Sequence, residues 1–245
     1  MNVWVYTICR NEAVMMPFFL RHYETFATKI IAYDEQSTDG TREMLKAHPL
    51  VEVREWPHKG LDDEHFLNAV NTFWIGADCD WVIWADVDEL LYHPNPFFEL
   101  ACNDASAIRS IGYALISANG FDPKAGGQIY DQVKTGIRQP NYDKIICWRP
   151  QVKMVHTIGR HTYQGQFPKC SGLISDIPGF YLLHCHHVGG VEWTRQINQR
   201  NYDRAVNKKY AWNYSPGHND DPNQVGSVAW VQSAIQNGKL EQVIP

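Results

Sequence analysis

The stretch Trp81-Val-Ile-Trp-Ala-Asp-Val-Asp88 decides the fold class of this chain. Its first five residues are apolar on both faces, which is typical of a parallel strand that helices cover on each side. Elsewhere in the first half, short apolar runs alternate with amphipathic ones, beginning with Val3 to Ile8 and Ala13 to Phe26. This βαβα rhythm predicts an α/β fold with a mostly parallel central sheet flanked by helices.

The 245 residues are enough for one large domain. From about Asn103 the rhythm gives way to strand-like pieces, Ala107 to Ser117 and Ile145 to Trp148, and later to a predicted helix over Glu192 to Lys208. We expect one continuous domain with two parts, residues 1–102 and residues 103–245, and place a mixed sheet region and a C-terminal helix in the second part.

Composition excludes some partners. The 22 basic and 27 acidic residues give a net charge of -5 without the basic stripe that nucleic acid requires. No run approaches the roughly 18 apolar residues of a membrane-spanning helix, so any membrane contact would be peripheral. The N-terminus lacks a secretory signal and the six cysteines are scattered, so we expect a cytoplasmic protein with reduced thiols.

Polar side chains follow three of the predicted strands, at Arg10-Asn11-Glu12, at Asp34 and at Asp86-Val-Asp88. Ligands of parallel sheets bind at the carboxyl ends of the strands, so these groups predict a single site. Asp34 closes a buried strand, where its carboxylate can accept hydrogen bonds from a base or a ribose hydroxyl.

Asp86 and Asp88 are two residues apart in an extended segment, so their carboxylates face the same side. At about 5 to 6 Å and an effective dielectric of about 20, they would repel by roughly 3 kcal/mol. A divalent cation relieves this repulsion, and carboxylate oxygens select Mg²⁺ or Mn²⁺. The alternative is a solvated loop in which Asp88 or Glu89 caps a following helix.

A histidine group, His184-Cys-His186-His187, follows an apolar run near the C-terminus. His184 and His186 share a face in a predicted strand, and His187 points to the other face. We expect His184 and His186 to join Asp86 and Asp88 as metal ligands, and a nitrogen ligand favours Mn²⁺ over Mg²⁺. A hydrogen-bonded structural histidine is the alternative for each, and a His/Asp metallohydrolase is a second hypothesis for the whole protein.

Three motifs occur in order across the first hundred residues: Thr7-Ile-Cys-Arg-Asn-Glu12, Tyr33-Asp-Glu-Gln-Ser-Thr-Asp-Gly-Thr41 and Trp84-Ala-Asp-Val-Asp-Glu-Leu90. Together they resemble the family 2 glycosyltransferases of the GT-A fold. The resemblance implies an inverting transfer of a sugar from a nucleotide diphosphate donor to a glycan or another hydroxyl acceptor. It implies that residues 1–102 form the nucleotide-sugar-binding half and residues 103–245 the acceptor-binding half. It also implies donor-binding roles, which we list here: Thr7, Arg10, Asn11, Glu12, Asp34, Asp86 and Asp88, with Thr7 and Asp34 at the nucleoside.

The sequence also departs from that family. Glu35 stands where many members carry a second Asp, and the Q-x-x-R-W signature of processive enzymes is absent after Trp193, so we expect single transfers.

No Glu-Asp pair marks the general base in the second half. An inverting transfer needs a carboxylate or His near the acceptor hydroxyl. The candidates are Asp122, Asp131, Asp143 and His161; we select Asp143, which precedes a predicted strand, with His161 as a second choice. A surface-loop carboxylate is the alternative for each Asp. A binding module that has lost catalysis is the third hypothesis.

Overall fold

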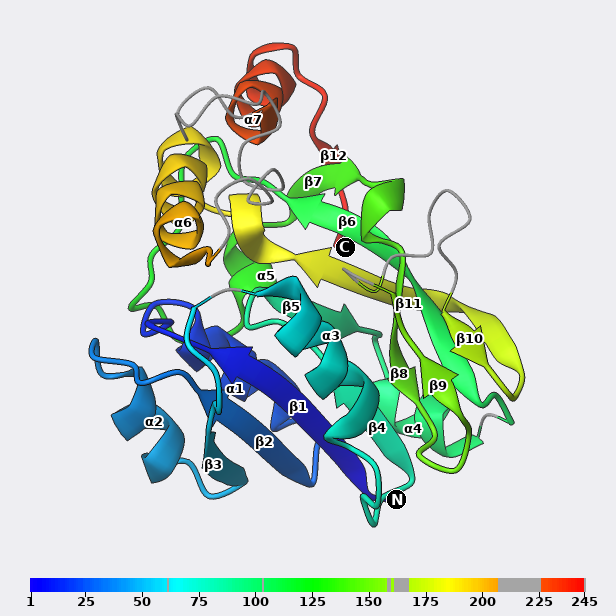
Figure 1. Ribbon diagram of the computed structural model, residues 1–245. Helices are drawn as coiled ribbons and strands as arrows, with labels where there is room; N and C mark the ends of the chain where they lie inside the picture. Colours follow the sequence, from blue (N-terminus) through cyan, green and yellow to red (C-terminus); the bar gives the residue numbers. More distant parts are fainter. Residues whose placement is uncertain (61, 103, 158–159, 161–167, 207–225, 245) are drawn as a thin grey trace.

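The computed structural model describes residues 1–60, 62–102, 104–157, 160, 168–206 and 226–244. Helices lie on both faces of a central sheet, with α3 in front of β1 and α1 behind it (Figure 1). The strands of the first half are β1 (Val3–Cys9), β2 (Lys29–Asp34), β3 (Val51–Glu55) and β4 (Trp81–Trp84). The helices between them are α1 (Met16–Tyr23), α2 (Thr41–Ala47) and α3 (Asp63–Thr72).

The rest of the chain adds further strands to the main sheet, which are β5 (Glu89–Tyr92), β6 (Ala107–Leu115), β7 (Thr135–Arg138), β8 (Lys144–Trp148), β11 (Ile174–His184) and β12 (Glu241–Gln242). A separate two-stranded sheet pairs β9 (Met154–Val155) with β10 (Lys169–Cys170). The helices are α4 (Pro96–Cys102), α5 (Ile129–Gln132), α6 (Gly190–Arg204) and α7 (Gly226–Gln236), with short 3-10 turns η1 (Pro140–Tyr142) and η3 (Cys185–His187).

The strand order of the main sheet is β12-β7-β6-β8-β4-β1-β2-β3, and β11 pairs with β5 and β6. Strand β1 is parallel to both β2 and β4, and β2 is parallel to β3. Strand β8 is antiparallel to β4 and to β6, so one sheet continues from the parallel first half into a mixed second half. The predicted α/β architecture is confirmed.

Burial on both faces explains why β4 is apolar throughout. All four residues of β4 are buried. Trp81 and Ile83 belong to the core beneath α1, with Phe18 and Phe19, whereas Val82 and Trp84 belong to the core beneath α3. Helix α3 starts at Asp63 because the Asp62 carboxylate accepts the amides of the first turn.

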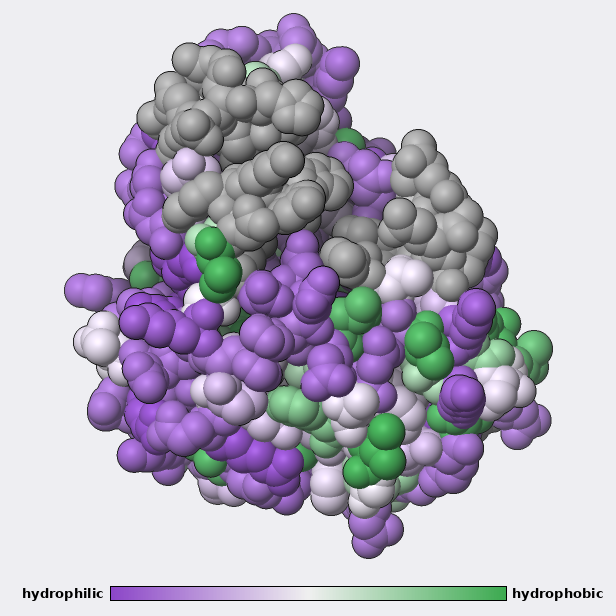
Figure 2. All heavy atoms as spheres, viewed as in Figure 1, coloured by the Kyte–Doolittle hydropathy of each residue, from purple (hydrophilic) through white to green (hydrophobic). Residues whose placement is uncertain are grey.

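Two predicted boundaries change. Strand β11 ends at His184, and Cys185–His187 form a 3-10 turn instead of continuing the strand. Helix α6 ends at Arg204 because Ala205 has extended backbone angles. No helix among the described residues is long and apolar enough to cross a bilayer. Hydrophilic residues dominate the face seen in Figure 2, and its apolar residues form separate spots.

Candidate functional site

A cleft of about 350 Å³ lies at the carboxyl ends of β1 and β4, between the two halves of the chain. The first half contributes strand-end residues and the segment after β3. The second half contributes the histidine turn and one face of α6. Charged, polar and aromatic side chains line the cleft, among them Glu12, Glu35, Trp56, Phe66, Asp86, Asp88, Tyr142, Lys144, Arg160, His184, His186, Asn198, Arg200 and Arg204.

Asp86 belongs to a buried network of charges. Its Oδ2 accepts a hydrogen bond of 2.8 Å from Arg160 Nη2, which also donates to Glu89 Oε2 at 3.0 Å. Lys144 Nζ donates to the other oxygen of Glu89 at 2.5 Å. Glu89 has no exposed surface, Arg160 has 1% and Lys144 has 5%. No local sequence pattern links Arg160 or Lys144 to the strand tip, so this network is not predictable from the sequence.

The network shifts the pKa values of its two acids in opposite directions. Burial raises the pKa of Asp86 to about 6, although Arg160 opposes the rise. Burial also acts to raise the pKa of Glu89, but Arg160 and Lys144 outweigh it and lower that pKa to about 2. Glu89 is therefore an anion held between two cations, beneath the cleft.

Asp88 has different partners. Its Oδ2 lies 3.4 Å from His186 Nδ1 and 4.0 Å from His184 Nε2, and among the described residues no Lys or Arg forms an ion pair with it. Its backbone carbonyl accepts the amide of Cys185 at 2.7 Å, which ties the strand tip to the histidine turn. Burial opposes ionisation, but the two histidines hold the pKa of Asp88 well below its usual range.

The orientation of His186 suits a cation. Its Nε2 lies 2.9 Å from Asn198 Oδ1, and Asn198 Nδ2 donates to Ser227 Oγ at 3.0 Å. When the ring is neutral and its Nε2 proton goes to the amide oxygen, the Nδ1 lone pair faces the Asp88 carboxylate; when the ring is protonated, Nδ1 donates to Asp88. Two electron-rich atoms at 3.4 Å repel unless a proton or a metal ion lies between them, and a hydrogen bond on the far nitrogen is what orients a metal-binding imidazole.

His184 completes this side of the cleft. Burial lowers its pKa to about 4, so the ring is neutral at pH 7. The ring stacks on Tyr142 with 4.2 Å between centroids, and its buried Nδ1 has no hydrogen-bond partner among the residues that the structure describes. The 3-10 turn, rather than strand alternation, brings His184 and His186 together, with ring centroids 5.8 Å apart. His187 also lines the cleft, and its Nδ1 lies 3.1 Å from Thr194 Oγ1.

These donors fit a divalent cation only in part. Within the described ranges, no group of three or more His, Cys, Asp or Glu side chains converges to hold a metal ion. Asp88 and His186 offer one carboxylate and one imidazole at close range. Mg²⁺ and similar ions are often bound through one or two carboxylates, with the remaining positions taken by substrate phosphates and water.

Thr7 and Asp34 lie outside the cleft, in contrast to the nucleoside contacts predicted for them. Both side chains have no exposed surface. Asp34 accepts a hydrogen bond from Arg42 Nη1 at 3.0 Å and from the Ser37 amide at 3.3 Å. Its oxygens are therefore already satisfied, and the buried Thr7 hydroxyl has no partner among the described residues.

Of the predicted group Arg10, Asn11 and Glu12, only Glu12 lines the cleft. Arg10 Nη1 donates to Glu35 at 2.8 Å. Asn11 has a φ of 54° and its side-chain oxygen accepts the Thr38 amide, so it shapes the turn.

Helix α6 faces the cleft with two arginines one turn apart. Arg200 donates to both oxygens of Glu12, at 2.7 and 3.2 Å, and Arg204 donates to Glu35 Oε2 at 2.7 Å. Burial raises the pKa of Glu12 to about 7, against the effect of Arg200. The two ion pairs join α6 to the first half of the chain and place guanidinium groups at the cleft surface.

Aromatic residues wall the cleft on the side of the first half. Trp56, which is 8% exposed, follows β3, and Phe66 lies on α3. The amide of Gly60 donates to Glu35 Oε1 at 2.6 Å, and this hydrogen bond holds the segment that follows Trp56 against Glu35. These two aromatic residues were not predicted as site residues, although the position of Trp56 directly after a strand was an available signal.

The structure is against Asp143 as the general base. Asp143 Oδ1 accepts the Gly112 amide at 2.7 Å, and its Oδ2 accepts Arg138 Nη2 at 2.7 Å. Its neighbours Tyr142 and Lys144 line the cleft, so the alternation of the chain turns Asp143 to the opposite side. Asp143 instead links Gly112 of β6 to Arg138 of β7.

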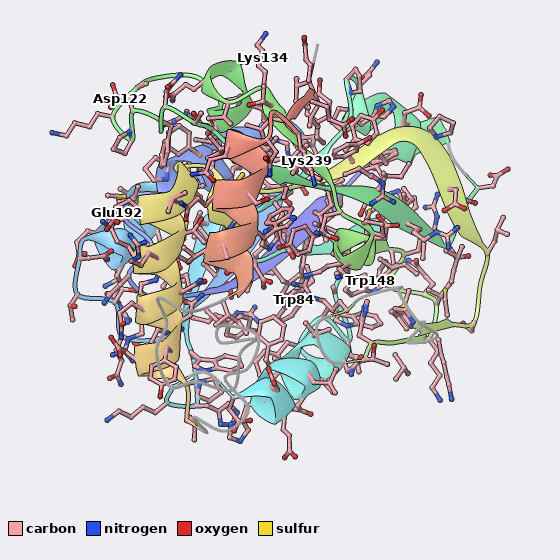
Figure 3. The ribbon with its side chains drawn as sticks, turned by 90° about the horizontal axis from the view of Figure 1, so that it is seen from above. Trp84, Asp122, Lys134, Trp148, Glu192 and Lys239 are labelled. Carbon is pink, nitrogen blue, oxygen red and sulfur yellow. The ribbon has the colours of Figure 1, made fainter. Side chains whose placement is uncertain are left out.

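The other candidate bases are also placed away from the cleft or undescribed. Asp122 lies in an exposed loop at the rim of the molecule, far from Trp84 at the end of β4 (Figure 3). Asp131 accepts the Gln128 amide and caps α5. His161 lies outside the described residues.

Comparison with known proteins finds no matching protein-family model and no matching curated protein. Among solved structures, S. aureus TarS 1-349 in complex with UDP is 13% identical, with 86% of this chain and 68% of that chain covered and a TM-score of 0.48. The galactosyltransferase LgtC in complex with donor and acceptor sugar analogs is 12% identical, with 44% and 46% covered and a TM-score of 0.31.

A putative glucose-1-phosphate thymidylyltransferase from Bacillus anthracis is 11% identical, with 87% and 99% covered and a TM-score of 0.39. No activity is carried over to this chain on similarity of this degree. Its own topology, a parallel β3-β2-β1-β4 unit continued by antiparallel β8 and β6 with a D-x-D tip, makes the fold GT-A-like.

Proposed function

We propose that this protein is a glycosyltransferase that moves a sugar from a nucleoside diphosphate donor to a hydroxyl acceptor, with Mn²⁺ or Mg²⁺ as cofactor. The observation that carries the proposal is the pair formed by Asp88 Oδ2 and His186 Nδ1, 3.4 Å apart at the strand tip. When His186 is neutral and donates its Nε2 proton to Asn198, its Nδ1 lone pair and the Asp88 carboxylate can bind a cation between them.

Asp88 and His186 would hold the cation, with His184 beside them. When bound, the cation stabilises the negative charge that develops on the departing diphosphate. Asp86 is less suited as a ligand, because Arg160 already occupies one of its oxygens.

The rest of the cleft supports recognition of a nucleoside diphosphate. Arg200 and Arg204 present guanidinium groups, which match phosphate oxygens in geometry and charge. Trp56 and Phe66 offer apolar ring surface in the cleft, and we propose that the base packs there. These side chains replace Thr7 and Asp34 as our expected nucleoside contacts.

The alternatives have less support. Catalytic zinc generally takes three protein ligands, and no such group occurs in the part of the chain that the structure describes. A metallohydrolase would nevertheless show itself by zinc in the purified protein. Inversion and single transfers remain proposals that rest on the family resemblance, and the anomeric configuration of the product by NMR tests the first.

A thermal-shift panel tests the proposed function. UDP, GDP, dTDP and CMP are each measured with Mn²⁺, Mg²⁺ or EDTA. A ligand at about 100 times its Kd adds about 2.7 kcal/mol of stability, or roughly 5–10 °C in Tm for a chain of this size. We expect one nucleotide diphosphate to reach this shift with a divalent cation and to lose most of it in EDTA.

The outcomes separate the hypotheses. Equal stabilisation with and without EDTA would overturn the cation site. Cation-dependent nucleotide binding without sugar transfer, in incubations of the sugar nucleotide with candidate glycans, would favour a binding module over an enzyme.

A further inference from the structure

Three acids lie within four residues at the tip of β4, and in the described part of the chain Asp88 alone among them forms no ion pair with a Lys or Arg. Arg160 bonds both Asp86 and Glu89, and Lys144 bonds Glu89. Asp88 contacts histidines alone among the described residues. The charges of the other two acids are thus balanced inside the protein before any ligand arrives.

Arg160 is firmly placed for this role. Arg160 bonds the two acids, and its Nη1 also donates to the backbone oxygen of Trp84, the last residue of β4, at 2.5 Å. The guanidinium is 1% exposed and lies over the ring of Phe66, 5.6 Å from its centroid. A planar guanidinium with fixed donors can hydrogen-bond the Trp84 carbonyl and both carboxylates at once, whereas the single ammonium group of a lysine lacks this forked geometry.

The ion pair with Arg160 limits the use of Asp86 as a cation ligand. Its carboxylate is 37% exposed at the cleft, so it has the position of a cation ligand. Its bond to Arg160 opposes that use, because a cation there would have to compete with a buried guanidinium. In this state the protein offers a divalent cation only Asp88 and the histidines, too few ligands for tight binding.

We propose that Arg160 makes cation binding in the cleft depend on the donor, by occupying Asp86 so that a divalent ion binds well only when a diphosphate supplies further oxygens. This inference rests on the proposed function. It makes Arg160 a positioning residue: it acts through Asp86 and sets the coupling between cation and nucleotide.

Mn²⁺ binding to the folded protein tests the proposal without any activity assay. Free Mn²⁺ is measured by electron paramagnetic resonance during titration, with and without the nucleotide diphosphate that the thermal-shift panel selects. In the wild type we expect weak Mn²⁺ binding alone and binding at least about tenfold tighter with nucleotide. In Arg160→Met we expect Mn²⁺ alone to bind about tenfold tighter than in the wild type, with the nucleotide effect reduced accordingly.

Lys144→Met is the charge-matched control. It removes the same positive charge from the network but leaves the bond between Arg160 and Asp86, so its gain in Mn²⁺ affinity should be clearly smaller than that of Arg160→Met. The double variant Arg160→Met/Asp86→Asn should lose the gain, because Asp86 is its source. Arg160→Met binding Mn²⁺ no tighter than Lys144→Met overturns the proposal.

Asp86→Asn provides a second test that does not remove a buried cation. If Arg160 occupies Asp86, this variant binds Mn²⁺ alone with wild-type affinity, within about twofold. A tenfold loss would show that Asp86 is already a ligand and would overturn the proposal even if Arg160→Met does not fold. Failure of the wild type to bind any nucleotide with Mn²⁺ would instead refute the proposed function.

Discussion

Glu89→Gln removes the buried anion that two cations share. The Glu89 side chain has no exposed surface and accepts hydrogen bonds from Lys144 at 2.5 Å and from Arg160 at 3.0 Å. Removing one member of a buried ion pair costs about 3–5 kcal/mol, because it leaves an uncompensated charge. We expect about 3 kcal/mol, the lower end of that range, because the amide oxygen still accepts one bond and Asp86 still faces Arg160.

Urea unfolding followed by tryptophan fluorescence measures this loss at pH 7. A loss of about 3 kcal/mol corresponds to a fall in Tm of roughly 6–12 °C for a chain of this length. The loss should also depend on pH. Because the pKa of Glu89 is lowered from 4.5 to about 2 in the folded state, its stabilisation is present above about pH 4.5 and is lost as pH falls towards 2.

The difference between wild type and Glu89→Gln should therefore shrink below pH 4.5. Glu192→Gln is the control, since Glu192 is 67% exposed and pairs with Arg195 on the surface of α6, where such pairs contribute little. A difference of less than about 1 kcal/mol at pH 7, where a broken buried pair should cost several times more, would refute the reasoning. So would a difference that stays constant between pH 7 and pH 3.

Three further predictions concern single residues. Asp88→Asn should abolish the cation-dependent part of the nucleotide thermal shift while the Tm of the free protein changes little; unchanged nucleotide binding would contradict the cation site. Asp143→Asn should keep sugar transfer within about threefold and lower stability by about 1 kcal/mol, measured by urea unfolding, because Arg138 loses a charged acceptor; loss of transfer would restore Asp143 as a base. Burial lowers the pKa of His22 to about 4, so stability should fall as pH drops from about 6.5 towards 4, when only the unfolded chain takes up the proton. In His22→Gln this fall should be shallower in urea titrations at each pH.

The sequence by itself determined the parallel half of the sheet and the position of the cleft. Trp81 to Trp84 are apolar at every position, and a run this short and rich in aromatic and β-branched residues indicates a strand that is buried on both faces. Asp86 and Asp88 follow it directly, so their place at the strand tip was also determined locally. The same holds for the approach of His184 and His186, although a 3-10 turn rather than a strand produces it.

Only the tertiary structure decided which polar groups face the cleft and which are paired beneath it. Arg160 bonds Asp86 from 74 residues away, and Arg200 bonds Glu12 from 188 residues away. Such contacts leave no pattern along the chain. Alternation gives the relative direction of neighbouring side chains but not which side is the cleft, and for that reason Asp143 was misplaced while Lys144, the next residue, lines the site.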